Sequence, residues 1–410
     1  MYILIVKLNR FIKDSCLKFS KMQLIDWRWN VMDELRPTIT ERRRQTRNKM
    51  YRYIYAAEAP VSKQQIATVL GYSLPTVHQN IAELLDAGLI KPGEILKSTG
   101  GRPAIGYTID EGIRCSIGIA VSSSQLRILA TDVRQNELAF KNVSLTSSES
   151  ATIGDQIAEE LEIFLSEYSI DRDKVLGVGI TFPGVIDQEA DVIVLSPTLR
   201  IKDISLSTVR RTIPFPVFIE NDSTSGGTAE WLGLSAKEKE EDFVYLFLEN
   251  GIGGAVFIDG KPYLGSSRRS GEFGHMCIVP DGRMCNCGKR GCLEAYCSAF
   301  RFTRDLGISV EEFFRRLSEG DRSCGRLWDE TLDYLSIGIN NLRMAFDCNV
   351  ILGGYISRYL EPYLPVLRAK TASRNTFEQK AGYIKPGKYP TKAGMMGVAW
   401  HFMDEFIQSI

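Results

Sequence analysis

The sequence lacks a long uninterrupted hydrophobic run. Its apolar opening, MYILIV, is only six residues long before Lys7, which is too short for a signal-peptide core or a membrane span. We therefore expect a cytoplasmic protein with no membrane partner. The sequence also lacks a bias toward disorder, because 44% of its 410 residues are hydrophobic and 24% are charged. Such a composition predicts a globular chain of two or three domains.

The chain as a whole lacks net charge, because its 50 Lys and Arg residues balance its 50 Asp and Glu residues. The charge is nevertheless unevenly distributed. Residues 1–105 carry 17 basic and 9 acidic side chains, a net of +8, whereas the remaining 305 residues carry 33 and 41, a net of −8. This split favours contact of the basic front with a polyanion, although solvated surface charge alone gives the same pattern.

The nine cysteines are an odd number, and without an export signal they favour a reducing compartment, where clustered cysteines bind metal more often than they oxidise. Four metal-binding side chains have the spacing H-x9-C-x-C-x4-C: His275, Cys285, Cys287 and Cys292. Three thiolates and one imidazole predict a structural Zn²⁺ site. Buried free thiols or a disulfide are the alternative, but Cys285 and Cys287 are too close to pair comfortably.

Two carboxylates, Glu272 and Glu294, flank this cluster, and Gly288 and Gly291 lie where a loop around one ion needs little steric bulk. A folded metal loop would hold both carboxylates near one imidazole. The arrangement outlines a small-molecule site. Support of the metal loop by the two carboxylates is the plainer alternative.

Residues 40–110 have the pattern of a winged helix-turn-helix. A helix that opens with a basic run at 42–52 precedes a short helix capped by Ser62 and ended by Gly71, and a second helix follows over 74–87. Two short helices, a tight turn and a basic flank are typical of DNA binding. A plain packing unit with a solvated basic face is the alternative. The outward positions that we expect to contact DNA are Lys63, Thr76, His78, Gln79 and Asn80.

Two further strands, over 90–95 and 105–109, predict the wing. Between them lies the basic turn TGGRP at 99–103, whose Arg102 we expect to enter a minor groove. On the second helix, Gln79 and Asn80 are the residue types that pair with adenine in a major groove. For His78, an exposed surface position without a base contact is an equal alternative. We assign no role to the leader, residues 1–39.

From Cys115 onward, strands alternate with helices, which predicts an α/β fold with ligands at the carboxyl ends of strands. Pro183-Gly184 and Asn221-Asp222 lie at such ends. A glycine loop at 249–255 is expected before a strand over 256–259. Its amides could approach an anion, although glycines in a hairpin often only make the turn. The other expected strands are 115–121, 125–132, 137–144, 175–181, 217–220, 243–248 and 350–352, and the expected helices are 153–169, 223–232 and 393–406.

Seven segments follow, in order, the motifs of one family: GITFPGVID, FIENDSTSGGTAEWLG, LENGIGGAVFIDGK, SGEFGH, CNCGKRGCLE, VILGGYIS and AGMMGVAW. Over residues 112–410 the chain resembles the repressor, open-reading-frame and kinase (ROK) family, and the winged front with its TGGRP turn resembles the repressor branch. The resemblance implies a two-lobed actin-like ATPase (ribonuclease H-like) sugar-kinase fold with a sugar cleft and a zinc loop at 271–294. The implied lobes are 111–225 with 386–410, and 226–385.

The resemblance also implies which side chains contact the sugar. Carboxylates and amides suit a polyol because each can bind neighbouring hydroxyls. In the family's kinases the carboxylate that matches Asp222 deprotonates the attacking hydroxyl. His275 can serve two roles, because one ring nitrogen can bind zinc while the other faces outward. The residues implied to bind the sugar are Gly184, Asn221, Asp222, Glu272, His275 and Glu294.

One motif departs from the family's kinases, which carry D-x-G-G-T in the first strand turn to hold Mg²⁺ and the nucleotide phosphates. Here Ala120 replaces the aspartate, and Ser122 and Ser123 replace the glycines. Phosphoryl transfer would lose its main electrostatic support. We therefore expect no enzyme activity. If the chain were a kinase, Asp222 would be its base.

These observations predict a sugar-responsive transcriptional regulator, a repressor of carbohydrate uptake or metabolism genes. Its expected partners are double-stranded operator DNA, a sugar or sugar-phosphate effector, and further copies of itself in a homodimer or homotetramer. An ATP-dependent sugar kinase is one alternative. A repressor controlled by a protein partner, such as a sugar-transport component, is another.

Overall fold

The computed structural model describes residues 38–96, 104–145 and 150–410. Arg102, the basic turn at 99–103 and nearly all of the leader lie outside the described residues, so what was expected of them stays a prediction. The chain divides into two compact units. One comprises Met1–Asp110 with Ile407–Ile410, and the other comprises Glu111–Phe406.

The described part of the first unit contains three helices: α3 (Ile39–Ala56), α4 (Lys63–Leu70) and α5 (Leu74–Asp86). α4 begins where the sequence predicted, because Ser62 Oγ accepts the N–H of Gln65 at 3.2 Å and Gln65 Oε1 accepts the N–H of Ser62 at 2.7 Å. It ends at Gly71, whose φ of 70° is left-handed. Apolar side chains from the three helices form the core of the unit: Met50, Tyr51, Ile54, Ile66, Val77, Ile81 and Leu84.

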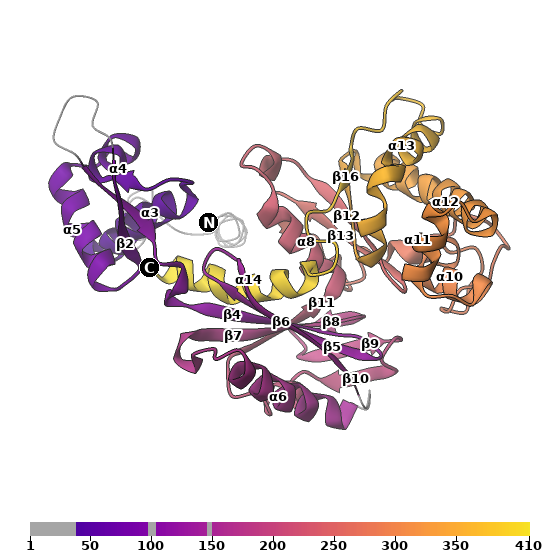
Figure 1. The fold of residues 1–410 in the computed structure, drawn as a ribbon, viewed down its shortest axis with the longest axis horizontal. Coiled ribbons are helices and arrows are strands. Elements are labelled where there is room, and N and C mark those ends of the chain that lie inside the picture. Colours follow the sequence, from indigo (N-terminus) through magenta and orange to yellow (C-terminus); the bar gives the residue numbers. More distant parts are fainter. Residues whose placement is uncertain (1–37, 97–103, 146–149) are drawn as a thin grey trace, which may run out of the picture. The chain divides into compact units, whose positions relative to one another are not determined.

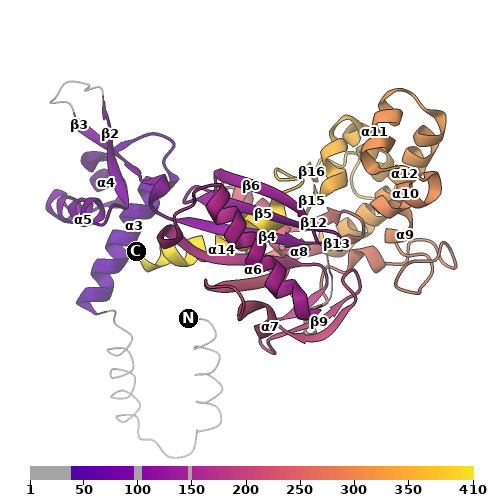
Figure 2. The same cartoon turned by 60° about the horizontal axis from the view of Figure 1, so that its bottom comes forward.

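A three-stranded antiparallel sheet completes the first unit. β1 (Val61–Ser62), β3 (Ala104–Ile109) and β2 (Ile90–Leu96) pair in the order β1-β3-β2. Figures 1 and 2 show α3, α4 and α5 gathered around this sheet. The predicted wing strands correspond to β2 and β3, which confirms the winged helix-turn-helix. The chain terminus also belongs to this unit, because Arg47 Nε of α3 donates to the Ile410 carbonyl at 3.0 Å.

The second unit contains two five-stranded sheets. The first has the strand order β11-β7-β4-β5-β6. Its antiparallel meander of β4, β5 and β6 matches the predicted strands, and β7 pairs parallel with both β4 and β11. The five strands are β4 (Cys115–Val121), β5 (Gln125–Asp132), β6 (Glu137–Ser144), β7 (Val175–Phe182) and β11 (Val217–Asn221).

One helix covers each face of this sheet (Figure 1). α6 (Ser150–Glu167) buries Ile157, Leu161 and Phe164 in the core beneath one face. α14 (Ala393–Ser409) lies directly on the other face. A Cβ on Gly118 would be 2.0 Å from the Met395 carbonyl oxygen of α14, so glycine is what allows the helix to lie this close. A separate small sheet, which the sequence analysis did not predict, has the order β10-β9-β8 and comprises β8 (Val185–Asp187), β9 (Val192–Ser196) and β10 (Ile201–Ser205).

The second five-stranded sheet has the order β14-β13-β12-β15-β16. Its strands are β12 (Phe243–Leu248), β13 (Ile252–Ile258), β14 (Lys261–Pro262), β15 (Asn349–Gly353) and β16 (Ile384–Pro386). On one face lies α8 (Asp222–Gly233), where a Cβ on Gly226 or Gly227 would meet the rings of Tyr245 and Phe257 at 2.8 Å and 2.4 Å.

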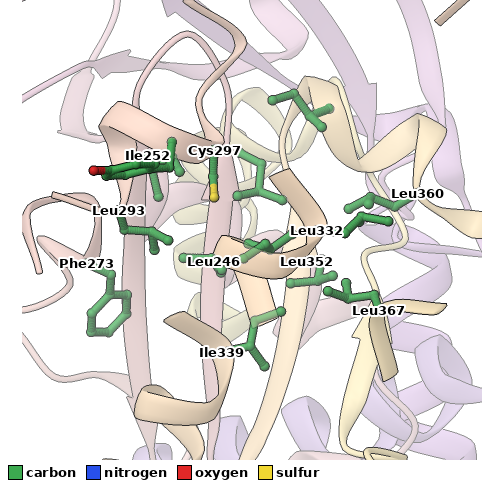
Figure 3. Packing of buried hydrophobic residues seen from close by; sticks show 14 of the residues in the cluster. Leu246, Ile252, Phe273, Leu293, Cys297, Leu332, Ile339, Leu352, Leu360 and Leu367 are labelled. Carbon is green, nitrogen blue, oxygen red and sulfur yellow. The ribbon is translucent and has the colours of Figure 1, made fainter. Parts of the chain in front are cut away.

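The other face of the second sheet packs on helices that the sequence analysis did not assign. They are α9 (Glu294–Cys297), α10 (Ala299–Leu306), α11 (Val310–Ser318), α12 (Arg322–Phe346) and α13 (Leu364–Ala372). Figure 3 shows Leu246 and Leu352 of the sheet packed with Leu332 and Ile339 of α12. This mixed α/β architecture, with two sheets and helices on both faces, confirms the predicted fold class.

The predicted glycine loop needs a correction. β13 begins at Ile252, so Gly253 and Gly254 are strand residues that pair with Phe247 and Leu246. Their role is close packing. A Cβ on Gly253 would be 2.3 Å from Ser223 Oγ, and one on Gly254 would be 2.4 Å from the Phe273 ring. Only Glu249, Asn250 and Gly251 remain between the two strands. Among the helices within the described ranges, none combines the length and apolar composition that a membrane span requires.

Candidate functional site

The exposed face of α5 carries several of the side chains predicted to contact DNA. Ser73 caps the helix by accepting the N–H of Thr76 at 3.4 Å, and His78 and Gln79 are exposed. Lys63, from the start of α4, places its Nζ 3.1 Å from His78 Nδ1. Gln79 Nε2 donates to Glu83 Oε1 at 3.2 Å, so this amide is held by a weak surface contact that a base edge could replace.

The structure contradicts the outward placement of Asn80. Its side chain is buried, with 8% exposed, and Nδ2 donates to the Thr76 carbonyl at 2.8 Å. The reason is helical spacing, because position 80 lies three residues after Val77 and one before Ile81 and so belongs to the edge of the buried stripe. Asn80 therefore holds the helix in place and does not face a groove.

The four predicted metal ligands come together. The potential donor atoms of His275, Cys285, Cys287 and Cys292 all lie within 4.8 Å of one another. Cys287 Sγ is 3.7 Å from Cys292 Sγ, and His275 Nδ1 is 3.8 Å from Cys285 Sγ. Gly288 and Gly291 adopt φ values of 81° and 84°, which explains why the tight loop needs glycine there. Four such donors could hold one metal ion.

Glu272 and Glu294 both border this cluster. His275 directs Nδ1 toward the cysteines, while its Nε2 lies 3.9 Å from Glu272 Oε2. Glu294 Oε1 lies 3.6 Å from Cys285 Sγ, and its Oε2 accepts the N–H of Ile252 at 2.9 Å. The two carboxylates therefore lie between the metal loop and the carboxyl end of β12.

The next predicted pair, Asn221 and Asp222, lies at the start of α8. Asn221 Oδ1 accepts the N–H groups of Ser223 and Thr224 at 2.9 and 3.0 Å, and its Nδ2 donates to the Gly184 carbonyl at 2.9 Å. Gly184 has a φ of 126°, and a Cβ there would be 2.3 Å from the Leu195 carbonyl oxygen. Gly184 and Asn221 both lie at the carboxyl ends of strands, as expected, and the parallel pairing of β7 with β11 brings these two ends together.

Asp222 is a buried carboxyl group that feels the charges of two other acids, Glu249 and Glu272. Its pKa is raised to about 7, mainly by burial and also by the charges of Glu249 and Glu272, against the opposing effect of the hydrogen bond from the Ser223 N–H. Asp222 Oδ1 accepts that N–H at 2.8 Å. A carboxyl with such a pKa can hold or release a proton near neutral pH, which suits it to face sugar hydroxyls in either state.

Glu249 is a residue to which sequence reasoning assigned no role. It directly follows β12, and its Oε1 accepts the N–H of Tyr355, the residue directly after Gly353-Gly354, at 3.1 Å. Burial raises its pKa, while Arg127 and the Tyr355 N–H lower it. The available signal was an acidic residue at the carboxyl end of a buried strand, next to a glycine turn.

Two surface cavities lie away from these residues. One of about 630 Å³ lies at the opposite ends of β12 and β15, beside Asp242, Asn349 and Arg343. Arg343 is already paired there with Glu378 at 2.5 Å. A second, of about 180 Å³, lies beside Phe243, Ile351 and Lys388. Neither cavity includes a predicted site residue.

Comparison with known proteins decides the family. Residues 116–405 match the ROK family, and residues 43–91 match a winged helix-turn-helix DNA-binding domain. The chain belongs to the ROK family. It is 26% identical over 360 residues to the xylose repressor of Bacillus subtilis, covering 86% of this chain and 93% of that protein. It is 25% identical over 236 residues to the Escherichia coli DNA-binding transcriptional dual regulator NagC, covering 57% of this chain and 58% of that protein.

Solved structures agree with this ROK fold. A ROK family transcriptional regulator described as a homologue of the E. coli MLC protein superposes with a TM-score of 0.71 at 20% identity, over 90% of this chain and 97% of that one. A ROK hexokinase from Thermus thermophilus gives 0.54 at 27% identity, over 70% and 96%. The matches to the xylose repressor and to the ROK family transcriptional regulator cover 86% and 90% of this chain. With its winged helix-turn-helix match, this ROK protein is a DNA-binding regulator of the repressor type.

Proposed function

We propose that this ROK protein represses genes of carbohydrate uptake or metabolism and that a sugar bound in its ROK domain weakens its hold on operator DNA. The observation that carries the proposal is the combination of a winged helix-turn-helix with polar side chains gathered at the ends of β7, β11 and β12. The proposed sugar contacts are Gly184, Asn221, Asp222, Glu272, His275 and Glu294. The relatives are named for xylose and N-acetylglucosamine, so these sugars are tested first.

The proposed domains follow the resemblance. Residues 40–110 would bind DNA, residues 111–225 with 386–410 would form one ROK lobe, and residues 226–385 would form the other. On α4 and α5, Lys63, Thr76, His78 and Gln79 would contact the operator, together with Arg102. A homodimer or homotetramer in the cytoplasm would place two such helices on a palindromic operator about one helical turn apart.

The metal in this proposal is zinc. A tetrahedral site with Zn–S bonds of about 2.3 Å has ligand edges of about 3.6–3.8 Å, and the spacings of 3.7 Å and 3.8 Å fit it. His275, Cys285, Cys287 and Cys292 would hold the ion, which would supply rigidity to the loop. Glu272, His275 and Glu294 would then be held at fixed positions against the sugar.

Catalysis is not part of the proposed function. Ala120 lies buried in β4, where the family's kinases have the metal-binding aspartate, and Ser122 closes the β4–β5 turn by donating to the Gln125 carbonyl at 3.0 Å. A sugar kinase stays the second candidate, because Asp222 retains a carboxyl whose pKa is about 7. Release of ADP in the presence of a hexose panel would favour the kinase. Repression controlled by a sugar-transport protein is the third candidate function, and it would be favoured if no free sugar binds to the chain.

The proposal is tested in two steps. Selection from a random duplex pool identifies the DNA that the full chain binds. A thermal-shift screen against common aldoses, amino sugars and their phosphates then identifies the effector, because a ligand well above its Kd raises stability by about 2–4 kcal/mol. We expect an enriched palindrome and at least one stabilising sugar. No enrichment, or no stabilisation by any sugar, would contradict the proposal.

A further inference from the structure

Backbone N–H groups that could bind an anion occur at three places beside the proposed sugar contacts. They are the start of α8, the turn between β12 and β13, and the turn at Gly353-Gly354 after β15. Such groups bind phosphate when they are free. In this chain a side-chain oxygen of the protein already accepts a backbone N–H at each of the three places.

At each place one of these N–H groups is bonded to a side-chain oxygen. Asn221 Oδ1 and Asp222 Oδ1 accept the Ser223 N–H at 2.9 and 2.8 Å. Glu294 Oε2 accepts the Ile252 N–H at 2.9 Å. Glu249 Oε1 accepts the Tyr355 N–H at 3.1 Å. Three of these four acceptors are carboxylates, so the same groups that bond the amides also add negative charge when they are ionised, which for Asp222 requires a pH above its pKa of about 7.

The acidic groups are close enough to influence one another, because the charges of Glu249 and Glu272 both raise the pKa of Asp222. Three basic side chains oppose them. Arg127 of β5 lowers the pKa of Glu249, and its Nη1 donates to the Thr391 carbonyl at 3.3 Å. His275 and Arg269 lower the pKa of Glu272, against the larger effect of burial. A phosphate carried by a sugar at this edge would therefore meet more carboxylates than cations and would find the N–H groups of Ser223, Ile252 and Tyr355 already bonded.

We propose that Glu249, acting with Asp222 and Glu294, makes the ROK domain select an unphosphorylated sugar and reject sugar phosphates. This inference rests on the proposed sugar response and names the chemical class of its effector. Glu249 is the specificity-determining residue, because its carboxylate closes the Gly353-Gly354 turn. Asp222 also contacts the sugar in the proposed function, and Glu294 also touches the metal loop through Cys285. Glu249 is thus the acid whose charge can be removed with the least effect on the proposed sugar contacts and on the metal loop.

The test compares matched pairs by isothermal titration of the full chain: xylose with xylose 5-phosphate, glucose with glucose 6-phosphate, and N-acetylglucosamine with its 6-phosphate. Glu249→Gln keeps an oxygen for the Tyr355 N–H and removes one charge. Glu378→Gln is the control, because it removes a charge beside Arg343 in the cavity at the opposite ends of β12 and β15.

We expect the wild-type chain to bind one free sugar at least 100-fold more tightly than its phosphate. Glu249→Gln should reduce that ratio at least 10-fold while leaving the Kd of the free sugar within about 3-fold, which also shows that the variant is folded. Glu378→Gln should leave the ratio unchanged. A sugar phosphate that binds the wild type as tightly as its free form would overturn this inference alone. An unchanged ratio in Glu249→Gln would overturn the role of Glu249. Absence of binding by every free sugar and every phosphate would overturn the sugar response and this inference with it.

Discussion

Glu294 Oε2 accepts the N–H of Ile252 at 2.9 Å, while the other oxygen of the same carboxylate lies 3.6 Å from Cys285 Sγ. One side chain thus joins the turn between β12 and β13 to the metal cluster. Loss of the metal would release the loop and remove the fixed position of this carboxylate. Metal content and effector binding should therefore be linked.

Replacing Cys287 with serine tests that link. We expect the wild-type chain to contain about one zinc per chain by elemental analysis and Cys287→Ser to contain much less. Sugar-induced stabilisation should fall in parallel, because without the ion the loop no longer holds Glu272, His275 and Glu294 at fixed positions. Cys277→Ser is the matched control, since Cys277 is an exposed thiol in the same loop outside the cluster. Full sugar binding by metal-free protein would contradict the link.

The pKa of Asp222 predicts a pH dependence of stability. Its folded value of about 7 exceeds its ordinary value of 3.8, so the protonated form is favoured by folding and its stabilisation is lost as the pH rises through about 7. Asp222→Asn removes the charge that burial penalises. We expect its melting temperature to exceed that of the wild type by about 2–5 °C at pH 8 and by less at pH 5.

Differential scanning calorimetry at both pH values checks this prediction. Glu240→Gln serves as the control, because Glu240 is an exposed acid of the same unit. A difference between wild type and Asp222→Asn that is independent of pH, or larger at pH 5, would show that the carboxyl is not held protonated by its surroundings.

Gln79 and Asn80 are adjacent on α5 but should behave differently. Gln79→Ala removes an exposed amide and should cost about 1–3 kcal/mol of specific DNA binding with little change in stability. Asn80→Ala removes a buried amide bonded to the Thr76 carbonyl and should lower stability by about 1 kcal/mol. Fluorescence anisotropy on the selected duplex and thermal melting of each variant separate the two effects. If both variants lost DNA binding equally and neither was destabilised, the assignment of Gln79 to DNA contact and of Asn80 to the helix core would be contradicted.

Gly254 tests the packing of β13 on the loop that carries His275. A Cβ there would be 2.4 Å from the Phe273 ring and 2.6 Å from the Tyr245 carbonyl oxygen. Gly254→Ala should lower the free energy of unfolding by about 1–3 kcal/mol through overpacking. Gly325→Ala is the comparison, because nothing lies within 4 Å of its Cβ position in α12, and alanine there should be neutral or stabilising by up to about 1 kcal/mol. Chemical denaturation measures both.

The sequence predicted those parts of the fold whose local signals agree with their burial. The strands β4, β5, β6 and β12 and the helix capped by Ser62 match, because alternation, buried runs and capping residues act over a few neighbours. The small sheet of β8, β9 and β10 was missed, because its strands are three to five residues long and give little periodic signal. The 25-residue helix α12 does carry buried positions with helical spacing, but the sequence analysis assigned no element there.

The candidate site was predictable to a similar degree. The four candidate metal ligands lie within one short loop, so their spacing in the sequence was sufficient to predict that their donor atoms come together. The turn-capping role of Glu249 depends on Tyr355, which is 106 positions away, and no local pattern indicates that contact. The burial of Asn80 did have a local signal, because 77, 80, 81 and 84 follow one helical stripe.

The central claim is that a sugar controls DNA binding by this chain. The most direct measurement is the affinity of the zinc-loaded full chain for its selected duplex, by anisotropy at fixed salt, with and without a saturating free sugar. The account predicts at least a 10-fold loss of affinity, equivalent to about 1.4 kcal/mol, and a much smaller loss for Asp222→Asn or Glu272→Gln. An affinity that is the same with and without every sugar that binds the chain would contradict it.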